Sequence, residues 1–293
     1  MTGQTDSKLL HRLPVREQRR EDLPRSIQFY GELIQLQNEA KSWIIVKKPN
    51  FTTDLVRDRL SQGTPLLLFD NFSPDWHQVQ MLFEQVAAWA NQDSKAPPGE
   101  KQSLIRIGTD IPRLTKLAEA WYLGHFSKDA VKEDGVDHEL LGSIITTTLM
   151  PFLAAYAKLL IPEVEQELWR RRYCPICGGS PDLAYLDKSA GARWLLCSRC
   201  DAGWLFVRLE CPYCGTHNQD SLTYFTDDGQ PLYRLYVCDE CRAYIKAVDL
   251  RHATSAALLA LERIITLDMD RQAQEKGYKP GAGTALTSGK FCR

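Results

Sequence analysis

Four Cys-x-x-Cys pairs constrain this chain more than any other feature of its sequence. The pairs, here called knuckles, are Cys174/Cys177, Cys197/Cys200, Cys211/Cys214 and Cys238/Cys241. Nineteen residues separate the first knuckle from the second, and twenty-three separate the third from the fourth. The order Cys-Pro-x-Cys-Gly, hairpin, Cys-x-x-Cys and aromatic strand therefore occurs twice, which indicates an internal repeat of about forty residues.

The knuckles have the spacing of metal ligands, because two intervening residues form a tight turn that directs both sulfurs toward one point. Proline presets such a turn, and glycine tolerates a positive φ where it closes. Two knuckles on neighbouring hairpins complete a tetrahedron of thiolates, which suits zinc or iron and disfavours hard cations. The repeat predicts site 1 from Cys174, Cys177, Cys197 and Cys200, and site 2 from Cys211, Cys214, Cys238 and Cys241. An interleaved pairing of the knuckles stays open.

Other uses of paired cysteines fit less well. A thioredoxin-like dithiol has one Cys-x-x-Cys near a βαβ unit, whereas four occur here in hairpin-like sequence. A [4Fe-4S] cluster also takes four cysteines, but symmetric doublets favour mononuclear sites. Four protein ligands leave no open coordination position, which argues against hydrolytic metal catalysis. Trp204 and Tyr244 follow the second and fourth knuckles and are candidates for an aromatic cover over each site, and Cys292 is expected to be a free thiol.

The remaining sequence predicts an α+β fold. Residues before about 170 contain no cysteine and read as amphipathic helices, and a final apolar helix is expected from 256 to 269, followed by Gly277. The expected N-terminal helices cover 23–41, a segment capped by Ser73 and running to about 90, 111–121, 140–160 and 162–172. The predicted domains are an α-helical domain at 1–170, rubredoxin-like or zinc-ribbon modules at 171–210 and 211–250, and a C-terminal helix with a tail at 251–293.

Charge and hydropathy exclude two classes of partner. The formal net charge is −1, and the segment 171–250 has nine Lys or Arg against ten Asp or Glu, so the basic surplus of a nucleic-acid-binding ribbon is missing. The segment 144–161 is apolar, but Pro151 and Lys158 favour a buried core helix over a membrane span. The charged N-terminus carries no apolar signal stretch, which predicts a cytoplasmic protein with reduced thiols and disfavours disulfides.

The cysteine-rich half resembles the formate dehydrogenase accessory protein FdhE family. The resemblance lies in CPICGGSP (174–181), GARWLLCSRCDAGWLFVRLECPYCG (191–215), YVCDECRAYIKAVDL (236–250) and LDMDRQAQEKGY (267–278), and in the helical half it is best in DLPRSIQFYGELIQLQNEA. It implies a cytoplasmic, non-catalytic factor that contacts the molybdenum- or tungsten-containing catalytic subunit of formate dehydrogenase before its export. It also implies that the eight knuckle cysteines hold iron in rubredoxin-like fashion, with zinc as the alternative metal.

Two other functions compete with this expectation. A rubredoxin-like electron carrier would use Cys-Pro-x-Cys-Gly in both halves of each site, whereas CSRCD and CDECR lack the proline and the glycine. Such a carrier would also not need a large helical domain. A zinc ribbon that binds nucleic acid is disfavoured by the charge balance. The sequence therefore favours a maturation factor, and it leaves the oligomeric state open.

Overall fold

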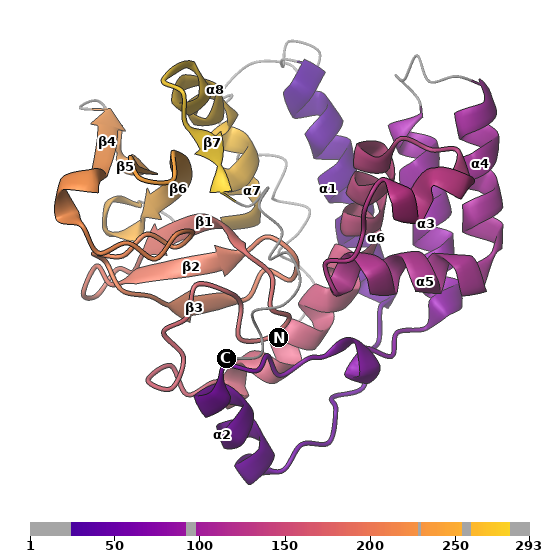
Figure 1. Ribbon diagram of the computed structural model, residues 1–293, viewed down its shortest axis with the longest axis horizontal. Helices are drawn as coiled ribbons and strands as arrows, with labels where there is room; N and C mark the ends of the chain where they lie inside the picture. Colours follow the sequence, from indigo (N-terminus) through magenta and orange to yellow (C-terminus); the bar gives the residue numbers. More distant parts are fainter. Residues whose placement is uncertain (1–24, 92–97, 228–229, 254–258, 282–293) are drawn as a thin grey trace.

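Helices form the first part of the chain and strands the second, as the ribbon in Figure 1 shows. This computed structural model describes residues 25–91, 98–227, 230–253 and 259–281. The α-helices before the strands are α1 (Arg25–Trp43), α2 (Thr53–Gln62), α3 (Trp76–Ala90), α4 (Pro98–Thr109), α5 (Ile111–Tyr122) and α6 (His138–Leu160), joined in places by 3-10 turns. The predicted α+β class with a helical N-terminal region is confirmed, while Cys292 lies outside the described residues.

Aspartate side chains begin three of these helices. Asp75 caps α3 by accepting the amide of the residue two positions on, at 2.9 Å, so the prediction of Ser73 as the cap is wrong. The backbone N–H of Ser73 instead donates to the hydroxyl of Tyr156 on α6, at 3.2 Å, and this bond holds Ser73 outside the helix. Asp137 caps α6 in the same way as Asp75, and Asp110 caps α5 by accepting the amide three positions on.

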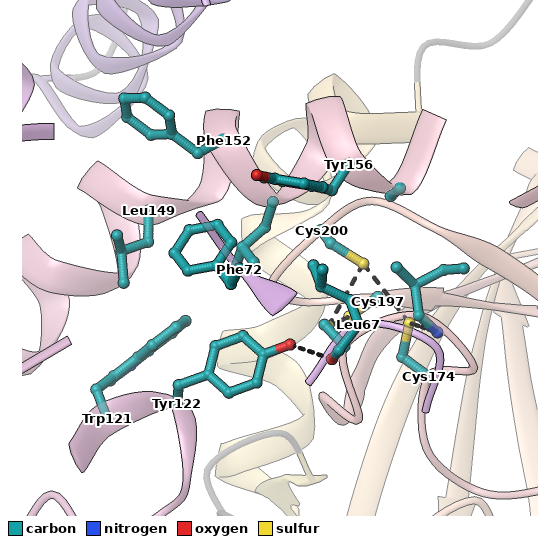
Figure 2. Packing of buried hydrophobic residues seen from close by; sticks show 14 of the residues in the cluster. Leu67, Phe72, Trp121, Tyr122, Leu149, Phe152, Tyr156, Cys174, Cys197 and Cys200 are labelled. Atoms are coloured by element: carbon teal, nitrogen blue, oxygen red, sulfur yellow. Dashed lines mark hydrogen bonds between the residues drawn. The ribbon is translucent and has the colours of Figure 1, made fainter. Parts of the chain in front are cut away.

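Helix α6 forms the centre of the helical part. Eleven of its residues are buried, among them Leu149, Phe152 and Tyr156, which pack with aromatic residues of the surrounding segments (Figure 2). The stretch 138–163 is long and apolar enough to cross a membrane, but 56 % of its most apolar window is buried inside the fold. Pro151 lies inside the helix and is buried. The expected buried core helix around Pro151 is therefore what the structure contains.

Two helical predictions need correction. The expected helix over 162–172 is wrong, because beyond a short 3-10 turn at Ile161–Glu163 the chain is irregular there. The expected C-terminal helix is divided into α7 (Leu259–Ile265) and α8 (Leu267–Glu275) at Thr266. Helices α2 and α4 were not expected from the periodicity at all.

The strands of both cysteine repeats belong to one sheet. They are β1 (Pro181–Leu186), β2 (Arg193–Cys197), β3 (Gly203–Leu205), β4 (Leu222–Asp227), β5 (Gln230–Cys238), β6 (Ala243–Asp249) and β7 (Lys279–Pro280). Their order is β3-β2-β1-β6-β5-β4, with β7 paired to β6. The parallel pair β1–β6, in which Ala184 lies opposite Ala247, joins the first repeat to the second. Each repeat therefore contributes one half of a continuous sheet.

Candidate metal centres

Site 1 brings together the sulfurs of Cys174, Cys177, Cys197 and Cys200. The Sγ atoms of Cys174 and Cys200 are 3.5 Å apart, and Cys177 Sγ lies 3.4 Å from Cys197 Sγ and 3.5 Å from Cys200 Sγ. All four atoms lie within 4.8 Å of one another, and none of the four residues is more than 3 % exposed. The first knuckle thus faces the second, and site 1 is buried, with Cys177 bordering a pocket.

Site 2 has the same composition but a different setting. Cys211 Sγ and Cys241 Sγ are 3.8 Å apart, and Cys214 Sγ and Cys238 Sγ are 3.7 Å apart. Cys211 and Cys238 are buried, whereas Cys214 is exposed and Cys241 is half-buried. The knuckles are grouped in sequential order rather than interleaved, and site 2 lies at the surface.

Both groups fit a tetrahedral metal ion. A metal–sulfur bond of about 2.3 Å gives a tetrahedron with edges of about 3.8 Å, close to the observed sulfur separations of 3.4 to 3.8 Å. Among the described residues, no histidine or carboxylate joins either group. The donors are therefore all soft sulfur, which suits zinc or iron. Each four-cysteine group could hold one metal ion.

Each knuckle closes through a residue of positive φ that directly follows its second cysteine. At the first and third knuckles these residues are Gly178 (φ 72°) and Gly215 (φ 80°), as their Cys-Pro-x-Cys-Gly sequences predict. At the second and fourth knuckles they are Asp201 (φ 57°) and Arg242 (φ 56°), which pay a steric cost that glycine avoids. Backbone amides also approach the sulfurs, since Arg199 N donates to Cys197 Sγ at 3.3 Å.

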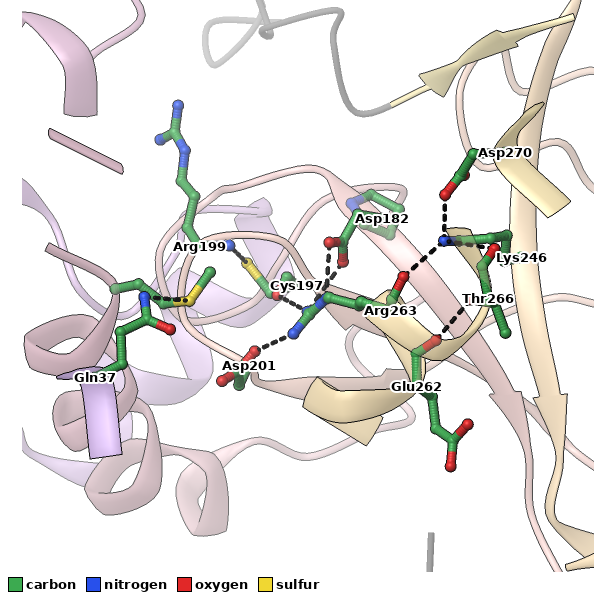
Figure 3. Close-up of polar contacts among 12 residues, drawn as sticks. Gln37, Asp182, Cys197, Arg199, Asp201, Lys246, Glu262, Arg263, Thr266 and Asp270 are labelled. Atoms are coloured by element: carbon green, nitrogen blue, oxygen red, sulfur yellow. Dashed lines mark hydrogen bonds and ion pairs between the residues drawn. The ribbon is translucent and has the colours of Figure 1, made fainter. Parts of the chain in front are cut away.

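The C-terminal segment supports both of these strained residues. Arg263 on α7 donates to Asp201 Oδ1 at 2.6 Å and to the carbonyl of Cys197 at 2.8 Å (Figure 3). Arg242 donates to the carbonyl of Lys276 at 3.0 Å, and its guanidinium lies 4.0 Å from the centre of the Tyr278 ring. Sequence reasoning missed this support, although two charged residues, Glu262 and Arg263, inside an apolar run were a visible signal.

Arg263 also pairs with Asp182 on β1, with 2.7 Å between Nε and Oδ2. Burial raises the pKa of Asp182, and the nearby guanidinium opposes that shift. Replacement of Arg263 by Met would leave Asp182 and Asp201 without their cation, so we expect the free energy of unfolding to fall by about 3 kcal/mol in urea titrations. The matched control is Arg271→Met on α8, where the exposed ion pairs with Asp268 and Glu275 predict a loss below about 1 kcal/mol. Equal losses in the two variants would contradict this role for Arg263.

Site 1 is fastened to the helical part of the chain. The amides of Leu66 and Leu67 donate to the carbonyls of Pro175 and Ile176 inside the first knuckle, both at 2.8 Å. The hydroxyl of Tyr122 on α5 donates to the carbonyl of Leu67 at 2.6 Å, so this short segment is held from both sides (Figure 2). The sulfurs of site 1 therefore lie between the sheet and the helices.

The other residues singled out in the sequence have structural contacts. Trp204 is buried, and its Nε1 donates to the carbonyl of Arg171 at 2.8 Å. Tyr244 is also buried, and its hydroxyl donates to Asp270 on α8 at 2.8 Å. Arg172 donates to the carbonyl of Tyr213 in the third knuckle at 2.7 Å. A cover over the sites by Trp204 and Tyr244 stays a prediction.

Comparison with known proteins agrees with this arrangement. Residues 173–208 match the family "FdhE, central domain". The "Protein FdhE homolog" of Aquifex aeolicus is 27 % identical over 274 residues, which cover 92 % of this chain and 90 % of that protein. The homolog of Shewanella oneidensis is 31 % identical over 126 residues, which cover 42 % and 41 % of the two chains.

A solved structure extends the likeness to the fold. The crystal structure of the FdhE protein from Pseudomonas aeruginosa superposes with a TM-score of 0.55 and 21 % identity. The superposition covers 86 % of this chain and 85 % of that chain, so the helical part and the cysteine-rich part are both included. The resemblance to the FdhE family that the cysteine motifs indicate is therefore confirmed.

Proposed function

We propose that this protein is a cytoplasmic accessory factor that binds the catalytic subunit of formate dehydrogenase and is needed to assemble the active enzyme. The observation that carries the proposal is the pair of four-cysteine groups in a chain that matches an FdhE homolog over 92 % of its length. The proposed role is non-enzymatic, because four protein ligands at each site leave no coordination position for a substrate. The charge balance of the strand region supports a protein partner over nucleic acid.

The eight knuckle cysteines are proposed to hold two metal ions, with iron as the first choice and zinc as the alternative. Iron held by four thiolates would supply one-electron chemistry, whereas zinc would only fix the fold. The domain boundaries at 170, 210 and 250 belong to the same proposal. They place the division between the repeats just before Cys211, in the loop between β3 and β4.

The decisive test is a pull-down of the purified formate dehydrogenase catalytic subunit by the tagged, full-length chain. We expect a stable complex that survives moderate salt, because the proposed contact does not depend on phosphate neutralisation. Active enzyme should also fail to accumulate in cells that lack the factor. No binding to the subunit, together with salt-dependent binding to nucleic acid, would reject the proposed function.

Electron transfer is the second candidate, and the exposure of Cys214 favours it, since electron exchange needs a metal close to the surface. The visible absorption of protein purified without oxygen tests this second candidate, because iron in a four-thiolate site absorbs and zinc does not. A colourless protein with two zinc ions would eliminate electron transfer and leave the accessory role intact.

A further inference from the structure

The two outer edges of the sheet differ in how they are protected. At the β3 edge, the amide of Leu205 donates to the side chain of Gln166 at 2.9 Å, and Trp204 is anchored to Arg171. The irregular segment that replaces the expected helix over 162–172 therefore covers this edge. Strand β4 forms the opposite edge and lies at the periphery of the molecule (Figure 1). No other described segment donates a backbone hydrogen bond to its outer side.

Strand β4 also lacks the usual safeguards of an edge strand. Exposed edges are normally short, or carry Lys, Pro or an early bulge, because unpaired amides and carbonyls invite another strand. Strand β4 has six residues, Leu222 to Thr226 contain no charge and no proline, and its pairing becomes irregular only at Thr226/Asp227. Tyr224 is 51 % exposed and Phe225 is 40 % exposed. This edge therefore remains competent to pair.

A small pocket lies beside this edge on one face of the sheet. Its volume is about 190 Å³, enough for one large side chain, and its lining includes Leu209, Tyr224 and Tyr236. Leu209 is 54 % exposed. On the other face of the strand, Lys276 after α8 lies 5.3 Å from the centre of the Phe225 ring, which is itself 40 % exposed. An added strand could therefore place one of its alternate side chains into the pocket.

We propose that β4 accepts an extended, uncharged segment of the partner protein as an additional strand, with one bulky apolar side chain in the pocket at Leu209 and Tyr224. Main-chain hydrogen bonds would hold the segment, and the pocket would select its sequence. The stretch 222–226 offers no charge to pair with a charged segment, whose desolvation along it would go uncompensated. Strand β4 begins opposite Cys238, so the docked segment would lie next to site 2. This inference rests on the proposed function, because the catalytic subunit of formate dehydrogenase is the probe.

The test measures hydrogen exchange of the full-length chain with and without the catalytic subunit. We expect the amides of 222–227 to gain protection in the complex. Tyr224→Lys and Thr223→Lys should each weaken binding about tenfold or more, since they add charge to the edge from opposite faces. The matched control is Ile45→Lys, at a side chain that is 86 % exposed on the helical part, and its affinity should equal that of the wild type. Unchanged circular dichroism and metal content exclude misfolding of the variants.

The outcomes separate this inference from the function on which it rests. Binding of the subunit without new protection in 222–227, and with wild-type affinity in the lysine variants, overturns the edge proposal and leaves the proposed function standing. If the wild-type chain does not bind the subunit, both the edge proposal and the proposed function are rejected. Protection of 222–227 in the free protein that grows with its concentration would assign the edge to a second copy of this chain, and it would likewise overturn the proposal.

Discussion

Replacement of Cys174 by Ser is expected to empty site 1 and to release the helical part of the chain from the sheet. The first knuckle is a turn whose shape depends on both of its sulfurs being held at one point. Its Pro175 and Ile176 carbonyls accept the amides of Leu66 and Leu67. Loss of the metal therefore removes the support of the turn, and the turn then no longer offers its two carbonyls as acceptors. The segment with Leu66 and Leu67 keeps only its bond to Tyr122 on α5.

The measurement combines metal analysis with hydrogen exchange. The Cys174→Ser chain should retain one metal ion instead of two, and the amides of Leu66 and Leu67 should exchange about tenfold faster or more. The matched control is Cys214→Ser in site 2, which should also lose one metal ion but leave exchange at Leu66 and Leu67 unchanged. Equal effects of the two variants on these amides would show that site 1 does not fasten the helical part.

The sites were predictable from the sequence because their determinants are local. A Cys-x-x-Cys turn needs only four residues to direct its sulfurs, and the repeat of two knuckles indicated which pairs meet. The glycines after Cys177 and Cys214 indicated the positive φ at those turns. The same conformation at Asp201 and Arg242 carried no such signal. Its support comes from Arg263, Lys276 and Tyr278, between 34 and 62 residues later in the chain, which no local pattern connects to the knuckles.

The parts of the fold that escaped prediction depend on contacts between distant segments. The parallel pair of β1 with β6 joins strands about sixty residues apart, and alternating apolar residues cannot specify which strands become neighbours. Ser73 and Asp75 are both good caps, and a bond from Ser73 to Tyr156, on a helix far along the chain, decides between them. The segment 162–172 has helical composition, but Gln166 and Trp169 are engaged by β3 and by the Tyr173 carbonyl.

The two sites are expected to lose their metal at very different rates. A chelator must reach the metal or a departing thiolate, and the surrounding shell controls that access. Site 1 offers much less access, because none of its cysteines is more than 3 % exposed and only Cys177 and Cys200 border a pocket. Site 2 presents Cys214 at the surface and Cys241 half-buried beside it. Metal loss to excess chelator should therefore occur in two phases of equal amplitude, with rates that differ about tenfold or more.

Variants that retain only one of the two sites show which phase of metal loss belongs to which site. The Cys174→Ser chain, which keeps site 2, should show only the fast phase, and the Cys214→Ser chain, which keeps site 1, only the slow one. A common rate in both chains would mean that metal loss is limited by unfolding of the shared sheet rather than by access, since β1–β6 pairing links the two sites in one body. Two separate rates would instead mean that access limits metal loss, so that site 1 retains its metal and continues to link the sheet to the helices. Site 2, with Cys214 at the surface, would then be the site whose metal exchanges with the solution.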